Sequence, residues 1–178
     1  MGKMLNLLKE GDRRTVGRVA DAVRLAIGKP AHIDELVDLL SDANPAVRMR
    51  AADALEKATV QHQALLEPHK DHLLELAEVA TQNEVRWHLA QLLTRLDLDE
   101  VEAEDVAEVF RRWFRRADSR IVKTSALQGM ADLALKDTEW VDEALEMIEV
   151  ALNSPIPALK TRARKLKGSL ERVKANNP

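Results

Sequence analysis

Apolar residues recur along this chain at the spacing of amphipathic helices. Positions three or four residues apart are apolar in the stretches Ile33–Leu40, Leu73–Ala80, Val106–Phe114 and Val141–Leu152. No stretch shows sustained apolar–polar alternation of the strand type, and glycine and proline are sparse, with six of each. The pattern therefore predicts a chain built from helices.

A short pattern repeats between these stretches. It begins at Val47-Arg48, Val85-Arg86, Val122-Lys123 and Leu159-Lys160, at successive offsets of 38, 37 and 37 residues, with a weaker copy at Arg18–Val23. Each copy follows residues that favour helix starts, namely Asp12, Asp42–Pro45, Gln82-Asn83, Asp118-Ser119 and Asn153–Pro155. A fixed period of this length indicates stacked repeats. We expect antiparallel helix pairs at about 2–28, 30–61, 64–97, 102–136 and 138–174, in a single domain over 1–178.

The second helix of each pair carries an apolar row that we expect to point inward. The row consists of Val47/Ala51/Leu55, Val85/Leu89/Leu93, Val122/Ala126/Met130 and Leu159/Ala163/Leu166. A helix pair cannot bury its apolar face alone, so the row predicts that successive pairs stack into a continuous core. Small residues, Ala51, Ala52, Ala90, Ala126 and Ala163, would allow close helix approach.

These second helices resemble those of the HEAT and HEAT-like repeat family, whose second helix opens with a Val-Arg step followed by small or apolar residues. The resemblance covers nearly the whole chain. It implies an all-α fold, a right-handed α-solenoid of about five helix pairs. It also implies a contact between the turn residue Asp42 and Arg48; at the equivalent turn position the other copies have Ala80, Ala117 and Ser154.

Composition and charge narrow the functional classes. The chain has 178 residues, no cysteine and a formal net charge of −3, with 32% charged residues. The lack of cysteine excludes disulfides and thiolate metal sites and fits a cytoplasmic protein. No segment reaches the roughly 18 apolar residues of a membrane span, and the N-terminal apolar run is too short for a secretory signal, so no membrane partner is expected.

Candidate chemistry is sparse. We find no HExxH motif, glycine-rich phosphate loop or nucleophile elbow, so we predict no catalytic residues, no cofactor and no metal. His69 and His72 could share a helix face near Asp71, but nothing fixes a third ligand, and a surface role is the simpler interpretation.

Two basic segments suggest nucleic-acid binding. The possible contacts are Arg111, Arg112, Arg115, Arg116, Arg120 and Lys160, and the last helix is basic, with Lys160, Arg162, Arg164, Lys165, Lys167, Arg172 and Lys174 against Glu171. Each segment has a simpler interpretation. Phe110, Trp113 and Phe114 form a core stripe that leaves the arginines to solvent or to nearby acids, and a basic helix can serve as a terminal cap. The architecture also resembles that of alkylpurine DNA glycosylases, but no catalytic residue maps onto this sequence.

Our leading hypothesis is a non-enzymatic scaffold or adaptor that binds a protein along its concave face. The alternatives are nucleic-acid binding through the basic helices and DNA-glycosylase-like catalysis. The second helices are expected to line that face. Once the apolar row is assigned inward, the expected partner contacts are Arg18, Asp21, Arg50, Asp53, Trp87, His88, Gln91, Ser125, Gln128, Arg162 and Lys165.

Overall fold

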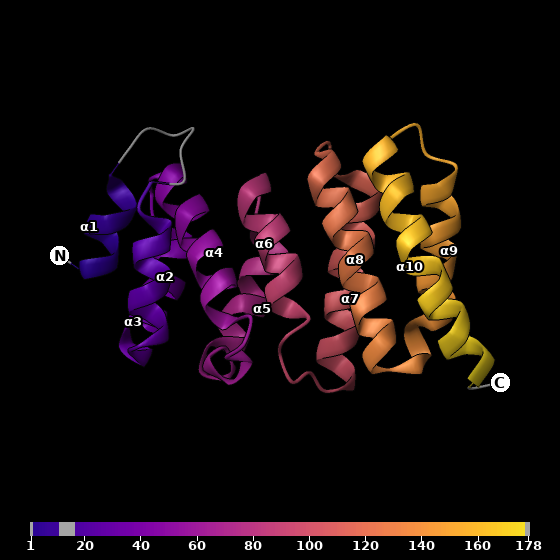
Figure 1. Cartoon of the computed structure of the whole chain (residues 1–178), viewed down its shortest axis with the longest axis horizontal. Coiled ribbons are helices and arrows are strands. Elements are labelled where there is room, and N and C mark those ends of the chain that lie inside the picture. Colours follow the sequence, from indigo (N-terminus) through magenta and orange to yellow (C-terminus); the bar gives the residue numbers. More distant parts are fainter. Residues whose placement is uncertain (1, 11–16, 177–178) are drawn as a thin grey trace. The chain divides into compact units, whose positions relative to one another are not determined.

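The computed structural model describes residues 2–10 and 17–176. Its helices are α1 (Lys3–Lys9), α2 (Val19–Ile27), α3 (Pro30–Asp38), α4 (Pro45–Thr59), α5 (Lys70–Val79), α6 (Asn83–Leu93), α7 (Glu100–Arg116), α8 (Arg120–Lys136), α9 (Val141–Leu152) and α10 (Pro157–Asn176) (Figure 1). Short 3-10 turns η1 (Leu39–Ser41), η2 (Gln63–Leu65), η3 (Glu67–His69) and η4 (Thr138–Trp140) lie between them. The described ranges contain no strand, which confirms the all-α class of repeated helix pairs.

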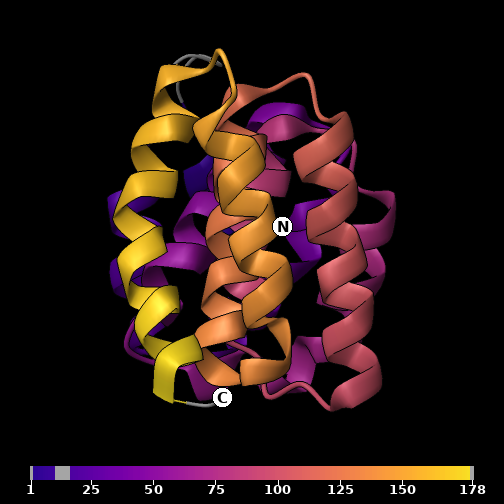
Figure 2. The same ribbon diagram turned by 90° about the vertical axis from the view of Figure 1, so that its right-hand side faces the viewer.

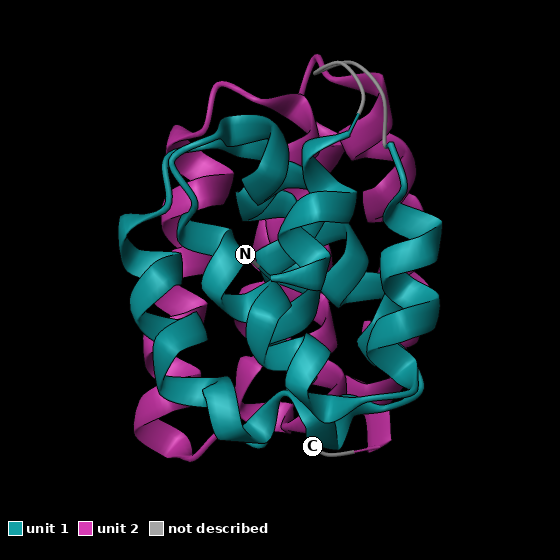
Figure 3. Ribbon diagram, turned by 90° about the vertical axis from the view of Figure 1, so that its left-hand side faces the viewer, with its two compact units in different colours: residues 1–97 teal, residues 98–178 magenta. Residues whose placement is uncertain are grey.

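The chain divides into two compact units, residues 1–97 and 98–178 (Figure 3). In unit 1, the second helices α2, α4 and α6 pack in sequence, α2 on α4 and α4 on α6. In unit 2, α7 packs on α8, and α10 packs on both α8 and α9; Figure 2 turns this unit toward the viewer. Second helices of neighbouring repeats therefore lie side by side within each unit. The predicted single domain over 1–178 stays a prediction.

The predicted inward row forms the core of each unit. Val47, Ala51 and Leu55 are fully buried, and their equivalents in α6, α8 and α10 are buried with the exception of Leu166, which is half-buried. The small residues Ala51, Ala52, Ala90, Ala126 and Ala163 are all buried as well. The first helices follow their predicted stripes less strictly, since Val79, grouped with the stripe of α5, is 71% exposed.

Helix starts agree with the sequence in part. Asn44 caps α4 by accepting a hydrogen bond from the Ala46 amide, and Ser119 caps α8 through the Val122 amide. The prediction that Asn83 caps a helix is wrong, because Asn83 is the first residue of α6 and no side chain caps that helix. Helix α10 begins at Pro157, two residues after the expected proline. The expected cap Asp12 lies outside the described residues.

Candidate functional site

The residues expected to line one binding face do not share one environment. In unit 1, Arg50 is only 1% exposed and Asp53 only 8%, so the expectation that both face a partner is wrong. The Arg50 guanidinium donates from Nη1 to the Leu8 carbonyl oxygen at 2.7 Å. That carbonyl belongs to the last turn of α1, where helix carbonyls lack partners within the helix. Arg50 therefore turns inward to complete α1.

The remaining predicted residues of unit 1 differ in exposure. Arg18 is exposed and pairs with Asp21, its Nε lying 2.7 Å from Oδ2. This pair raises the pKa of Arg18 and lowers that of Asp21, in each case chiefly through the hydrogen bond between them. Trp87 and Gln91 on α6 are half-buried, and the Trp87 ring lies 5.7 Å from that of His88 between centroids. The exposed part of this face in unit 1 is thus mainly the Arg18–Asp21 pair.

A polar cluster that is largely buried except at Lys57 lies between α4 and α6. We define the α4–α6 cluster as Asp53, Glu56, Lys57, His88 and Arg95. The side chains of Asp53, Glu56 and His88 are each 12% exposed. Lys57 Nζ lies 2.8 Å from Asp53 Oδ1, and Arg95 pairs with the Glu56 carboxylate while also donating to the Glu56 carbonyl at 2.6 Å.

His88 stands apart within this cluster because it is only weakly engaged. Its Nε2 lies 4.0 Å from Asp53 Oδ1, beyond hydrogen-bond distance, and its Nδ1 is buried with no hydrogen-bond partner. Burial lowers the pKa of the His88 imidazole, and the nearby Asp53 and Glu56 carboxylates only partly oppose that shift. Burial therefore favours the neutral form of the ring over the charged form.

In unit 2, the predicted contact residues of the second helices differ from those of unit 1 in their exposure to solvent. Ser125 and Gln128 on α8 are half-buried, whereas Arg162 and Lys165 on α10 are exposed. Arg162 donates to Gln128 Oε1, and Gln128 Nε2 donates to Asp132 Oδ1 at 2.7 Å. We call Gln128, Arg162 and Lys165 the α8–α10 face. Arg50 is buried at the equivalent position of unit 1, whereas Arg162 is exposed to solvent, and so is Lys165.

The arginine-rich end of α7 is partly neutralised. Arg111 contacts Glu104, Glu108 and Glu143, and the hydrogen bonds to Glu143 raise its pKa further above the usual range. Arg112 is half-buried, and Phe110, Trp113 and Phe114 are buried as the core stripe predicts. Arg115, Arg116 and Arg120 are exposed, and Lys160 is half-buried. Of the expected nucleic-acid contacts, Arg111 therefore has its charge balanced within the protein.

Some basic side chains of α10 are likewise paired with carboxylates, and others are not. Lys167 pairs with Glu149 of α9 and with Glu171, and Lys174 Nζ lies 2.8 Å from Asp142 Oδ1. The side of α10 that meets α9 is thus matched by acidic residues. On the side that meets α8, Arg162 and Lys165 have no carboxylate partner among the described residues.

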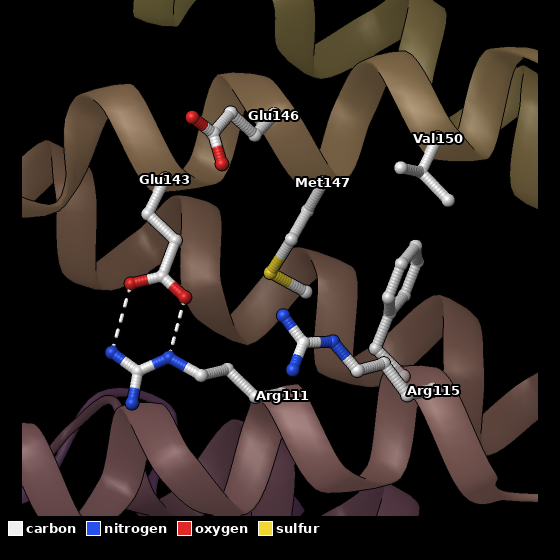
Figure 4. A pocket seen from close by; sticks show the side chains of 7 residues that line it. Arg111, Arg115, Glu143, Glu146, Met147 and Val150 are labelled. Carbon is white, nitrogen blue, oxygen red and sulfur yellow. Dashed lines mark hydrogen bonds and ion pairs between the residues drawn. The ribbon is translucent and has the colours of Figure 1, made fainter.

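A groove of about 140 Å³ lies between α7 and α9 (Figure 4). Its lining includes Phe114, Arg115, Glu146, Met147 and Val150, together with the Arg111–Glu143 pair. Figure 4 shows Arg115 and Met147 projecting toward one another across it. A second groove, of about 150 Å³, lies in unit 1 and is lined by Leu40, Ser41, Arg48, Leu76, Val79, Ala80, Thr81, Gln82 and Val85.

The basic residue of the repeated Val-Arg or Val-Lys step has the same role in α4, α6 and α8. Arg48 Nη1 donates to the Asp42 carbonyl oxygen at 2.7 Å, Arg86 Nε to the Ala80 carbonyl at 2.6 Å, and Lys123 Nζ to the Phe114 carbonyl at 2.9 Å. Each cation therefore satisfies carbonyls at or just beyond the end of the preceding helix. The expected contact between Arg48 and Asp42 exists, but it is made with the backbone and not with the carboxylate, which accepts instead from the Asn44 amide.

This repeating geometry agrees with the comparison to known families. A family model described as HEAT repeats matches residues 3–94, more than half of the chain. The chain belongs to the HEAT repeat family. Searches of curated proteins and of solved structures found no match. None of the described helices is long and apolar enough to cross a membrane.

Neighbouring HEAT repeats contact each other through the predicted rows. The side chain at the Asp53 position of one repeat meets the side chain at the Arg50 position of the next, as in Asp53 with His88 and Gln128 with Arg162. Glu56, Lys57 and Arg95 were missed by sequence reasoning. The spacing of Asp53 and Glu56, three residues apart on one helix face, was the available signal.

Among the histidines considered for metal binding, His69 lies 3.0 Å from Asp34 and His72 is exposed.

The Arg111–Glu143 pair should contribute measurably to the stability of unit 2. Both side chains are less than a third exposed, and two parallel hydrogen bonds join them. A double-mutant cycle with Arg111→Ala and Glu143→Ala, followed by urea unfolding, should give a coupling energy of about 1–2 kcal/mol. The corresponding cycle for exposed Lys174 and Asp142 serves as the control. Equal coupling in the two cycles would contradict the prediction.

Proposed function

We propose that this HEAT repeat protein is a non-enzymatic scaffold whose α8–α10 face binds an acidic segment of a protein partner. The observation that carries the proposal is the contrast in charge pairing along α10. Lys167 and Lys174 are matched by carboxylates, whereas Arg162 and Lys165 are exposed and have no carboxylate partner in the part of the chain that the structure describes. Exposed cations beside a polar Gln128 can pair with partner carboxylates at little cost in desolvation.

The charge distribution favours a protein partner over nucleic acid. A duplex requires several cations placed along its phosphates, and each contributes to a strong salt dependence. Here Arg111 and two of the α10 lysines are already paired, and the formal net charge is −3. The nucleic-acid alternative rests on Arg115, Arg116 and Arg120, which are exposed near the turn between α7 and α8.

Site-specific photo-crosslinking tests the proposal. A photoreactive amino acid is placed at Lys165 on the α8–α10 face or, as the control, at exposed Glu146 on α9, in cells that naturally make the protein. We expect discrete adducts from position 165 that protease removes and nuclease does not, and few from position 146. Nuclease-sensitive adducts would favour the nucleic-acid alternative, and adducts confined to position 146 would place the interface elsewhere.

A further inference from the structure

Three side chains of the α4–α6 cluster are arranged as a set of metal ligands. One donor atom from each of Asp53, Glu56 and His88 lies within 4.8 Å of the other two. Asp53 and Glu56 stand three residues apart on α4, and His88 projects from the neighbouring helix α6. Sites built from carboxylates and a histidine on facing helices are a recurrent way in which helical proteins hold metal ions. We propose that Asp53, Glu56 and His88 bind a divalent first-row transition ion, with Zn²⁺ as the expected ion.

The histidine is the observation that goes beyond a group of acidic residues. Metal binding requires a neutral imidazole with an available nitrogen. The buried Nδ1 of His88 has no hydrogen-bond partner, and Nε2 lies 4.0 Å from its nearest carboxylate oxygen. Neither ring nitrogen therefore has to give up a hydrogen bond in order to coordinate an ion.

The carboxylates are held in place by neighbours that can accommodate an ion. Arg95 binds Glu56 through the guanidinium and also donates to the Glu56 carbonyl, which orients this ligand from outside, as second-layer partners of metal sites do. Lys57 pairs with Asp53, but its side chain is 51% exposed and can move into water when an ion takes over the charge interaction.

The geometry requires only small adjustments. Donor atoms about 2.1 Å from a tetrahedral Zn²⁺ lie roughly 3.4 Å apart. The three donors, now within 4.8 Å of one another, therefore need to approach by up to about 1.4 Å, which side-chain rotation can supply. Three protein ligands leave a fourth position for water. No metal was expected from the sequence, in which His69 and His72 were the histidines that could share a helix face, and the site at His88 is a different one.

Titration of the full chain with Co²⁺ and with Zn²⁺ tests the proposal. We expect one equivalent of Co²⁺ per chain to produce visible d–d absorption, and calorimetry with Zn²⁺ to give a dissociation constant below about 100 μM. His88→Gln should weaken Zn²⁺ binding at least tenfold and remove the Co²⁺ absorption. His72→Gln, which alters an exposed histidine of α5, should leave both unchanged.

The controls separate loss of the site from loss of the fold. Circular dichroism should give the same helical spectrum for both histidine variants, and Asp53→Asn provides a second variant that keeps the shape of the ligand. Equal binding by wild type and His88→Gln, or no saturable one-to-one binding by wild type, would overturn the proposal. These measurements do not involve the α8–α10 face, so either proposal can fail without the other.

Discussion

Arg50→Ala should lower the free energy of unfolding by about 3–4 kcal/mol, which is a large loss for a single substitution. Arg50 is the largest of the fully buried side chains among the described residues. Its guanidinium donates a hydrogen bond to the Leu8 carbonyl at the end of α1. Alanine would leave that carbonyl without its donor in a buried position and would open a cavity between α1 and α4. Urea unfolding monitored by circular dichroism measures the change.

The matched control is Arg162→Ala, since Arg162 holds the same register position in the last repeat. Its side chain is exposed, so its removal should change the unfolding free energy by less than about 0.5 kcal/mol. If the two substitutions cost the same, Arg50 does not have the structural role described above.

Gly129→Ala should destabilise the protein by about 1–3 kcal/mol, although the same change usually stabilises a helix. Gly129 lies in α8 against the Phe110 ring of α7, and an added Cβ would lie 2.6 Å from Phe110 Cζ. Because Phe110 is fully buried, its ring cannot move away without disturbing the core. The unfavourable contact should outweigh the gain of roughly 0.5–1 kcal/mol in helix propensity.

Gly168→Ala supplies the comparison in the same unit. Gly168 is exposed on α10, and beyond the backbone of its own helix turn an added Cβ would meet no atom within 4 Å. This variant should gain roughly 0.5–1 kcal/mol in thermal or urea unfolding. A Gly129→Ala variant that gained stability to the same extent would show that the contact between α7 and α8 is looser than described.

The sequence was sufficient to predict the helix pairs because the core row repeats in register. The row recurs at intervals of four residues, as in Val47, Ala51 and Leu55. Residues at this spacing lie on one side of a helix, so the spacing shows which side is apolar. The family match over residues 3–94 agrees with that periodicity. The periodicity did not show which polar residues beside the row would be buried and which would be exposed. Arg50 is buried because α1 ends near it with an unsatisfied carbonyl, a condition that no residue in α4 reveals.

The candidate sites were predicted less well for a related reason. The rows were treated as free surface, but second helices of successive repeats pack side by side, so their polar side chains meet one another. Asp53 and His88 became part of a buried cluster by this route, whereas Arg162 and Lys165 stayed exposed on α10. Partners such as Glu56 and Arg95 lie 39 residues apart in sequence and come together only through packing.

The most direct test of the scaffold proposal is the affinity for the partner recovered by crosslinking at position 165. Calorimetry would compare wild type with the double variant Arg162→Glu/Lys165→Glu and with Glu146→Lys, after unfolding measurements confirm equal stability. Reversing both charges on the α8–α10 face should weaken binding about 10–100-fold through repulsion of the acidic segment, and Glu146→Lys should leave it unchanged. Full affinity in the double variant, with loss of binding by Glu146→Lys, would contradict the proposal and place the interface on the groove between α7 and α9.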